Sequence, residues 1–167
     1  VDMGIARSGE DAIDFDGSVL DESGRIRLED YGHFELNLVS MGNPHCVVFL
    51  DDWNPQLLEQ IGPLLCQHKA FRLGTNVQLA RFLEERIIEV LIWERGVGVT
   101  AASGTSACAV AVAAVKAGKV SAGTFHIWME GGSLQVSVDN QYRVTLRGPV
   151  QEVCQGRLTD GFVRFIS

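Results

Sequence analysis

Most of the chain alternates apolar and polar residues, or carries short β-branched runs, as strands do. In the last third, such segments are joined by Gly131-Gly132 and by Asp139-Asn140-Gln141, residues that tolerate the positive φ of hairpin turns. The C-terminal third is therefore predicted to be an antiparallel meander. The segments with strand character are His33–Ser40, His45–Leu50, Asn76–Leu83, Arg86–Glu94, Phe125–Glu130, Leu134–Asp139, Tyr142–Arg147 and Phe162–Ile166.

Two segments have helical spacing instead. After Asn54-Pro55, an N-cap residue and a proline suited to the first helical position, apolar residues recur every three or four positions. Pro63 is expected to break or restart this surface helix. The second helix, Gly104–Ala117, carries no charge before its last turn and is followed by Gly118, a typical end signal. A helix that is apolar on every side has to be buried, so we predict an α+β fold in which a mixed, largely antiparallel sheet wraps around it.

Composition favours one folded domain spanning residues 1–167. Of these residues, 46% are hydrophobic and 21% are charged, and no linker or repeat divides the chain. The 14 basic and 21 acidic residues give a net charge of −7, which disfavours contacts with nucleic acids and anionic membranes. No apolar run approaches the roughly 18 residues of a membrane span, and the first residues lack the pattern of a signal peptide. We expect a cytoplasmic protein.

The cysteines are widely separated, with neither a Cys-x-x-Cys pair nor the Cys/His spacing of a zinc site. We expect small buried residues in a reducing compartment, with no disulfides and no bound metal. The four are Cys46, Cys66, Cys108 and Cys154.

The start of the apolar helix is the first candidate site. In Ser103-Gly104-Thr105-Ser106, the free N–H groups of the first turn and the positive end of the helix dipole can receive a carboxylate or phosphate oxygen. Gly104 would let a ligand approach the backbone closely. The alternative is that Ser103 or Thr105 only caps the helix.

Glu94-Arg95 ends the strand RIIEVLIWE and precedes a glycine-rich turn that leads toward the helix start. If the two ends converge, Arg95 offers a forked donor for a carboxylate and Glu94 an acceptor for an ammonium group. This combination suits an amino acid. The alternative is an exposed salt bridge at a strand end.

Two further polar residues stand at the starts of strands. His45 follows Asn43 and leads into an apolar strand, so it is either a structural histidine or a group tuned for proton transfer. Asn76 begins the next strand, where asparagine is often only a turn residue. The remaining histidines are interpreted as surface or packing residues: His33, His68 and His126.

The strings MGNPHCVVF, GTNVQLA, WERGVG and ASGTSACA occur in this order, with VDMG at the start and GPV at Gly148–Val150. Together they resemble the second half of diaminopimelate epimerase, and the resemblance covers nearly the whole chain. It implies two pseudosymmetric halves, each a sheet around a central helix, with an amino-acid substrate between them. The chain, which has a regular pattern from Val1 onward, is then a piece of a longer protein, and the missing N-terminal half is its partner. An isolated half would expose the apolar wall of its cleft, so we also expect self-association into a homo-oligomer.

The resemblance also implies a reaction, the cofactor-independent interconversion of LL- and meso-diaminopimelate in the biosynthesis of lysine and peptidoglycan precursors. In the family, two cysteines face opposite sides of the α-carbon; one removes the proton as a thiolate and the other returns a proton as a thiol. Ser103 occupies the position of one of these cysteines, while His45 and Glu94 match groups thought to adjust the thiols. The positions that match substrate contacts are Asn43, Asn76, Glu94, Arg95, Gly104 and Thr105.

Ser103 is the main departure, because the family reads A-C-G-T-G-A-C-A where this chain reads A-S-G-T-S-A-C-A. A serine hydroxyl ionises far less readily than a thiol and needs an adjacent base, for which His45 is the only nearby candidate. Cys108 lies five residues further along the helix and is expected in the core.

Three explanations of Ser103 stay open: an engineered substitution that traps substrate, a natural change that leaves one working thiol in the missing half, or a domain that has lost catalysis. The alternatives to the epimerase are correspondingly a related amino-acid isomerase or dehydratase, and a non-catalytic domain that binds an amino acid or an anion. All of these require the helix start to meet the strand ends that carry Arg95, Asn43 and Asn76 in one concave wall.

Overall fold

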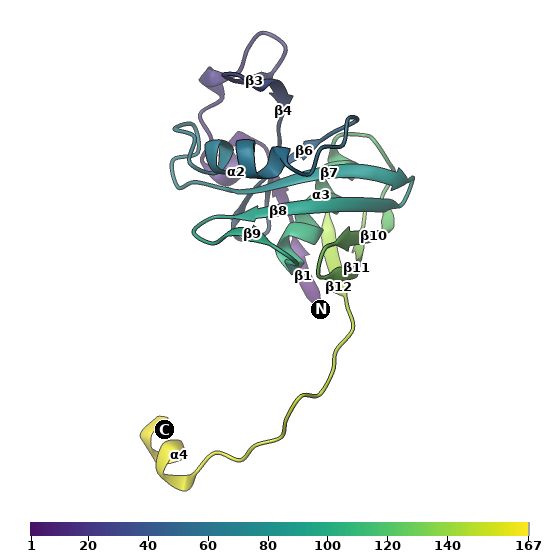
Figure 1. Ribbon diagram of the computed structural model, residues 1–167. Helices are drawn as coiled ribbons and strands as arrows, with labels where there is room; N and C mark the ends of the chain where they lie inside the picture. The colour runs from purple at the N-terminus through teal and green to yellow at the C-terminus, as the bar shows by residue number, and fades with distance from the viewer. Residues whose placement is uncertain (167) are drawn as a thin grey trace.

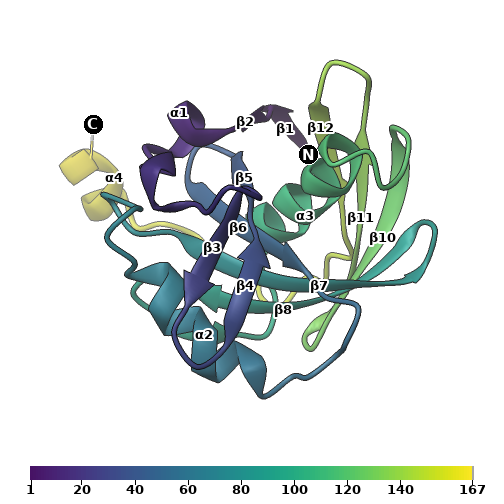
Figure 2. The ribbon, with the colours of Figure 1, turned by 90° about the horizontal axis from the view of Figure 1, so that it is seen from above.

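Helix α3 (Gly104–Lys116) lies at the centre of the computed structural model, which describes residues 1–166, and a sheet curls around it (Figure 1 and Figure 2). Every residue from Ser106 to Ala114 is buried. These side chains are all small, so the surrounding strands can approach the helix closely. The predicted α+β fold, a mixed sheet around a buried central helix, is confirmed.

The sheet is nearly closed. Its strands are β1 (Asp2–Ile5), β2 (Arg7–Ser8), β5 (Asn37–Ser40), β6 (Pro44–Phe49), β7 (Asn76–Glu84), β8 (Ile87–Glu94), β9 (Gly98–Thr100), β10 (Gly123–Met129), β11 (Gly132–Val138) and β12 (Arg143–Arg147). They follow the order β1-β12-β11-β10-β8-β7-β6-β5-β2, with β9 paired to β8 beside this path. The pairs β6–β7 and β10–β8 are parallel and the others antiparallel. Because β1 and β2 are consecutive in the chain, the two ends of this strand order lie close together. Strands β10, β11 and β12 form the antiparallel meander predicted for the C-terminal third.

Alternate residues of the central strands enter two apolar clusters, one on each face of the sheet. Ala80 of β7 and Val47 of β6 pack with α3, whereas their neighbours Leu79 and Val48 pack with α2 (Leu57–Cys66) on the opposite face. This is the period of two that a strand imposes on its side chains. The same alternation determines which polar residues at the strand ends face α3.

Helix α2 begins later than predicted and continues without a break. Asn54 accepts hydrogen bonds from the N–H of Gln56 through its side chain and from the N–H of Leu57 through its carbonyl, both at 3.1 Å. It therefore belongs to a turn that precedes the helix. Pro63, expected to break or restart the helix, lies inside it. The carbonyl that this proline leaves unpaired belongs to the exposed Glu59, so solvent can bind it and the helix continues.

The predicted strand His33–Ser40 divides at Leu36. Its first part is β4 (Gly32–Glu35), which pairs with β3 (Arg25–Leu28) in a separate two-stranded sheet, and its second part is β5. Leu36 packs against the cluster around α2, so a continuous apolar pattern spans a change of sheet. The elements before this strand were not predicted from the sequence patterns; they are β1, β2, α1 (Glu10–Ile13), the 3-10 helix η1 (Gly17–Val19) and β3.

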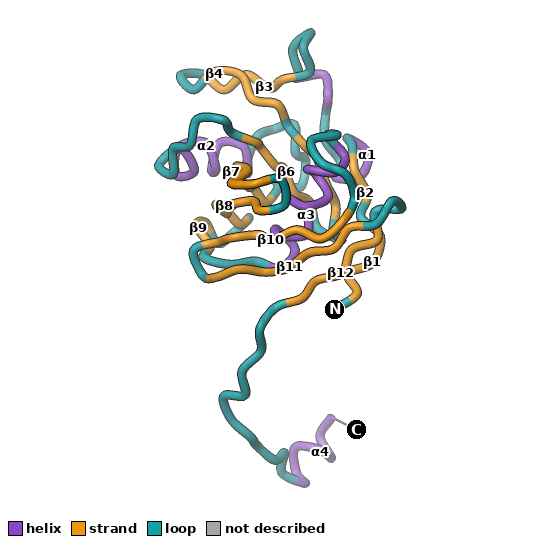
Figure 3. Tube along the Cα trace, turned by 90° about the vertical axis from the view of Figure 1, so that its right-hand side faces the viewer, coloured by secondary structure: helices purple, strands orange, loops and turns teal. Residues whose placement is uncertain are grey.

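Beyond β12 the chain leaves the sheet and runs extended to a short helix (Figure 1 and Figure 3). The segment Phe162–Ile166, predicted as a strand, belongs to this helix, α4 (Asp160–Ile166), near whose start the N–H of Phe162 donates to Oγ1 of Thr159 at 3.3 Å. A short apolar run does not by itself distinguish strand from helix, and this one has no strand beside it. Cys154 lies in the extended stretch between β12 and α4 and is exposed, against the expectation that every cysteine is buried.

Within residues 1–166, no helix is both long and apolar enough to cross a membrane. In the same residues, no cluster of three or more histidine, cysteine, aspartate or glutamate side chains is arranged to hold a metal ion.

Candidate active site

The candidate residues of β6, β7 and β8 gather at one edge of the sheet. β6 and β7 are parallel and begin there with His45 opposite Asn76, and β8, antiparallel to β7, ends there. The side chain of Asn76 bonds to both neighbouring strands: Nδ2 donates to the carbonyl of Pro44 at 3.0 Å, and Oδ1 accepts the backbone N–H of Arg95 at 2.9 Å. One buried amide therefore holds the starts of two strands against the end of a third.

The first turn of α3 is bonded to the same region. Ser103 is the N-cap residue, and its Oγ accepts the N–H of Ser106 at 3.4 Å. The Oγ of Ser106 in turn accepts a hydrogen bond of 3.1 Å from Nε2 of Gln78. Gln78 is two residues after Asn76 on the α3-facing side of β7. The helix start and the strand edge are thus parts of one hydrogen-bonded junction.

Gly104 and Thr105 are the first helical residues and are partly exposed. N–H groups in a first turn have no intrahelical acceptor, and they lie at the positive end of the helix dipole. This end of α3 can therefore bind an anionic oxygen. Packing gives a second reason for glycine at position 104, since a Cβ there would lie 3.0 Å from Cδ2 of Leu146.

Glu94 and Arg95 diverge at the end of β8. Glu94 is on the α3-facing side, where Oγ1 of Thr100 donates to its Oε2 at 3.4 Å. Arg95 is exposed, and its Nη1 donates to the carbonyl of Leu73 in the loop that leads to β7. Within residues 1–166 neither side chain takes part in an ion pair, so a simple surface salt bridge does not describe this strand end.

His45 is 0% exposed, and its Nε2 lies 3.0 Å from Oδ1 of Asn43. Burial lowers the pKa of His45 from 6.5 to about 4; the Gln78 amide partly opposes this change, and the charge of Arg95 adds to it. The ring is therefore neutral at pH 7. In the described part of the chain no hydrogen bond joins the Ser103 hydroxyl to His45 or to another side-chain base.

Three cysteines are buried, and none of them takes the place of a thiol at position 103. Burial raises the pKa of Cys108 to about 12 and also raises the pKa values of Cys46 and Cys66. Cys108 is 0% exposed in the cluster around α3, as expected of a core residue. These groups remain protonated thiols at neutral pH.

Gln78 and Thr100 belong to the site but were not singled out from the sequence, and Ser106 was named only as the last residue of the string Ser103–Ser106. Gln78 carries a usable signal, because it is a polar residue on the same face of its strand as the apolar Ala80 and Phe82. Ser106 carries none, since its partner is 28 positions away in the sequence and only the fold brings the two together.

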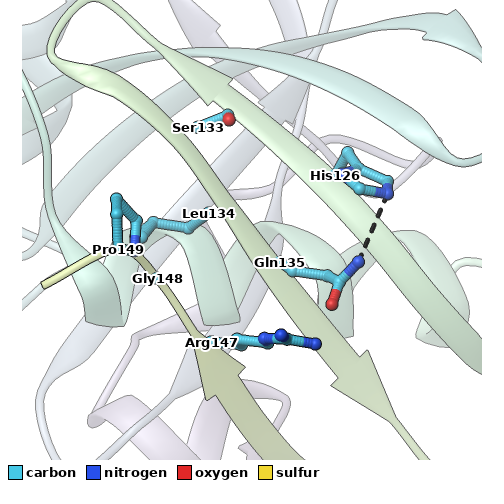
Figure 4. A pocket seen from close by; sticks show the side chains of 7 residues that line it. All are labelled: His126, Ser133, Leu134, Gln135, Arg147, Gly148 and Pro149. Atoms are coloured by element: carbon cyan, nitrogen blue, oxygen red, sulfur yellow. Dashed lines mark hydrogen bonds between the residues drawn. The ribbon is translucent and has the colours of Figure 1, made fainter.

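Of two surface cavities, one adjoins the candidate site and the other lies away from it. One of about 220 Å³ is lined in part by Asn43 and Leu73 and so adjoins the candidate site. The other, of about 360 Å³, lies on the outer face of β10–β12, where His126, Gln135 and Arg147 form a row across three strands (Figure 4). None of the candidate residues lines the second cavity.

The sequence profile of the family described as diaminopimelate epimerase matches residues 37–153. Among curated diaminopimelate epimerases, the protein from Geobacillus kaustophilus is 37% identical over 161 residues and that from Desulforudis audaxviator is 40% identical over 158. These alignments cover 93% and 94% of this chain but 54% and 56% of the relatives. The chain thus spans about half the length of the curated relatives it matches.

Solved structures share the fold at low sequence identity. A hydroxyproline epimerase from Agrobacterium vitis, with bound trans-4-hydroxy-L-proline, aligns with a TM-score of 0.56 at 16% identity, over 81% of this chain and 43% of that one. A probable proline racemase from Agrobacterium radiobacter aligns with a TM-score of 0.52 at 13% identity, over 86% and 47% of the two chains. These likenesses concern the fold alone. The profile match and the identity to curated relatives show that the chain belongs to the diaminopimelate epimerase family.

Proposed function

We propose that the chain is the substrate-binding C-terminal half of a cytoplasmic amino-acid epimerase that interconverts LL- and meso-diaminopimelate without a cofactor. The observation that carries the proposal is the junction of the α3 N-terminus with the common edge of β6, β7 and β8. This junction supports the proposal, because a helix end that can bind an anion lies close to side chains that suit a zwitterion. The names of the curated relatives support diaminopimelate as the substrate.

Each polar group has a part in this proposal. The substrate carboxylate binds the first-turn N–H groups of Gly104 and Thr105. The ammonium group binds the carboxylate of Glu94, and the guanidinium N–H groups of Arg95 that Leu73 does not occupy donate to a carboxylate. The remaining contacts are the amides of Asn43 and Asn76.

Ser103 is the group that this half presents to the α-carbon. A base on the opposite half removes the α-proton, and a donor on this face returns a proton to the carbanion, which inverts the centre. A hydroxyl can donate that proton, but without an adjacent base it does not remove one at pH 7. Ser103 therefore suits one direction of the exchange, and a cysteine in its place would serve both.

A second candidate function is amino-acid binding without turnover. One observation favours it: the Oγ of Ser103 caps α3, and in the described part of the chain no side-chain base is bonded to it. The binding groups would be the same in both cases.

The N-terminal half is the partner that the proposed reaction requires. One face of the α-carbon needs a base that this chain does not supply, and the chain spans about half the length of its curated relatives. In the absence of that half, we propose that the exposed cleft wall drives self-association into a homo-oligomer.

The proposal is tested by mixing the chain with the separately produced N-terminal half of the Geobacillus kaustophilus relative in deuterium oxide. Mass spectrometry then follows deuterium uptake at the α-carbon of diaminopimelate. We expect the Ser103→Cys chain to exchange at least ~100-fold faster than the unsubstituted chain, the size of a typical acid–base contribution. Ser133→Cys, which adds a thiol on an exposed strand residue, is the control and should not accelerate exchange.

Calorimetry completes the test. Preferential binding of diaminopimelate over inorganic phosphate, without exchange in either chain, would favour the non-catalytic candidate. No exchange and no preference over phosphate would contradict both.

A further inference from the structure

Among the residues that the structure describes, two buried side-chain polar atoms lack a hydrogen-bond partner, and both belong to the candidate site. They are Nδ1 of His45 and Oε1 of Gln78, on side chains that are 0% exposed. The two groups are near each other, because His45 pairs with Asn76 across parallel β6 and β7 and Gln78 follows two residues later on the same face of the sheet. Buried polar atoms are nearly always hydrogen-bonded. Two neighbouring atoms without partners therefore indicate that, in this orientation of the side chains, a donor does not face an acceptor.

The contact at the other end of the ring depends on how the Asn43 amide is oriented. Nε2 of His45 lies 3.0 Å from Oδ1 of Asn43, and a carbonyl oxygen only accepts, so in this orientation Nε2 is the protonated nitrogen. A half-turn of the Asn43 amide would present a donor instead, so the group that faces Nδ1 decides between the two tautomers. With Nε2 protonated, and since burial keeps the ring neutral, Nδ1 has a lone pair and needs a donor, which Oε1 of Gln78 is not.

A half-turn of the Gln78 amide exchanges its oxygen and nitrogen and satisfies every atom involved. Nε2 of Gln78 then donates to Nδ1 of His45, and the Oγ–H of Ser106, whose oxygen lies 3.1 Å from the amide, donates to Oε1. We propose that Ser106, Gln78, His45 and Asn43 form a chain of hydrogen bonds with one direction, and that Gln78 is a positioning residue that fixes His45 as the Nε2–H tautomer.

The direction of this chain has a consequence for binding, which rests on the proposed function. Because Oδ1 of Asn43 is occupied by the imidazole N–H, its Nδ2 is left to face the ligand. The Asn43 loop then presents a donor, which suits a substrate carboxylate. At the other end, Ser106 belongs to the turn that Ser103 caps, so the same chain holds the helix start in place relative to the Asn43 loop.

The test is the tautomer of His45 in the natural chain at pH 7, read from the ¹⁵N and ring-proton correlations of its imidazole. We expect a single species with Nε2 protonated and Nδ1 unprotonated, and slowly exchanging Gln78 amide protons close to the ring. A ring protonated at Nδ1, or an equal mixture of tautomers, would overturn the proposal.

Two variants separate positioning from packing. Gln78→Met keeps a side chain of similar length but removes the donor, and we expect it to lose the single tautomer while retaining a native far-UV spectrum. Gln135→Met is the matched control, because Gln135 also lies beside a histidine, His126 at 3.4 Å, but on the outer face (Figure 4). It should leave the His45 signals unchanged. Retention of the pure Nε2–H form in Gln78→Met would show that Asn43 alone fixes the ring and would contradict a role for Gln78.

This experiment needs no substrate, so its outcome is independent of the deuterium-exchange test. A chain with the expected tautomer that does not bind diaminopimelate would contradict the proposed function only. A chain that binds diaminopimelate with His45 protonated at Nδ1 would contradict the positioning role only.

Discussion

Oδ1 of Asn76 accepts the backbone N–H of Arg95 at 2.9 Å, so the first residue of β7 is bonded to the residue that follows β8. The Nδ2 of the same amide donates to Pro44, next to His45. A residue matched to substrate binding by family resemblance therefore also holds the walls of the site together. Binding and local stability are coupled at this position.

The first prediction follows from the two bonds of Asn76. Asn76→Ala leaves the Pro44 carbonyl and the Arg95 N–H unpaired in a mostly buried place, so we expect it to lower the free energy of unfolding by about 2–3 kcal/mol. Urea unfolding followed by circular dichroism measures the loss. Asn37→Ala is the control, because Asn37 makes one such bond, from Nδ2 to the carbonyl of Val47 at 3.2 Å. It should cost about 1 kcal/mol, and equal losses in the two variants would contradict the bridging role.

The second prediction is that burial of His45 makes the free energy of unfolding fall in acid. In the unfolded chain the His45 ring takes up a proton near its ordinary pKa of 6.5, whereas in the folded chain it does so only near pH 4. The unfolded state thus binds more protons between these values. The stability is fully present above about pH 6.5 and is lost as pH falls toward 4, by up to about 3 kcal/mol. Unfolding curves measured between pH 7.5 and 4 test this.

The contribution of His45 can be distinguished from those of the aspartates by the pH range and from that of His68 by a control variant. The lowered pKa values of Asp2, Asp16 and Asp21 matter mainly below about pH 5, where carboxyls with an ordinary pKa of 3.8 begin to bind protons in the unfolded chain, so the effect of His45 is read between pH 7.5 and 5. His68 also has a lowered pKa, from partial burial and then Lys69, and acts in the same direction as His45. We expect His45→Gln to flatten the pH dependence substantially and His68→Gln to flatten it slightly. A slope that survives in His45→Gln would show that another group is responsible.

Local patterns predicted the parts of the fold that depend on one segment. α3 was predictable because a helix without a polar face can only be buried, and β6, β7 and β8 because their apolar runs have strand length. The strand predicted at Phe162–Ile166 was wrong because nothing in a short apolar run reveals whether another strand lies beside it. Pro63 was misjudged because its cost depends on whether solvent reaches the carbonyl one turn earlier.

In the candidate site, too, residues marked by a local pattern were predictable, whereas contacts between distant segments were not. Asn43, His45, Asn76 and Glu94-Arg95 were chosen because polar residues at the ends of apolar strands are conspicuous, and the structure places them at one edge. The bond between Gln78 and Ser106 crosses from a strand to a helix and has no local pattern. The divergence of Glu94 and Arg95 to opposite sides of β8 follows from strand geometry once the strand end is known.

The third prediction concerns the loop that supports Arg95. Gly74 has a φ of +67°, and a Cβ there would lie 3.0 Å from the carbonyl oxygen of Cys66 and 3.1 Å from Cδ of Arg95. Gly74→Ala therefore combines backbone strain with a clash that displaces the guanidinium. Gly96→Ala is the matched control, with a φ of +82° and nothing within 4 Å of a Cβ.

The two variants should differ in a defined way. Gly96→Ala should cost only the strain of a left-handed residue, about 1–2 kcal/mol, and should leave ligand affinity unchanged. Gly74→Ala should cost more and also weaken diaminopimelate binding in calorimetry. Equal stability and equal affinity in the two variants would show that the Gly74 loop does not position Arg95.

The fourth prediction uses the cysteines to separate the core from the tail. Cys154 is exposed, whereas Cys46, Cys66 and Cys108 are buried and burial raises their pKa values, so a thiol reagent should modify one group per native chain at pH 8. The other three should react only at the rate of unfolding, and all four should react in denaturant. Cys154→Ser removes the rapid reaction if this assignment is right.

The Cys154→Ser background also tests whether the start of α3 is open to ligands. Adding Ser103→Cys should restore a rapid reaction, because the N-cap position of α3 is partly exposed and the positive end of the helix favours a thiolate there. The rate of modification at pH 8, compared with that of the Cys154→Ser chain, measures this. If the thiol introduced at position 103 reacts as slowly as Cys108, the helix start is closed, and the proposed binding of a carboxylate there is wrong.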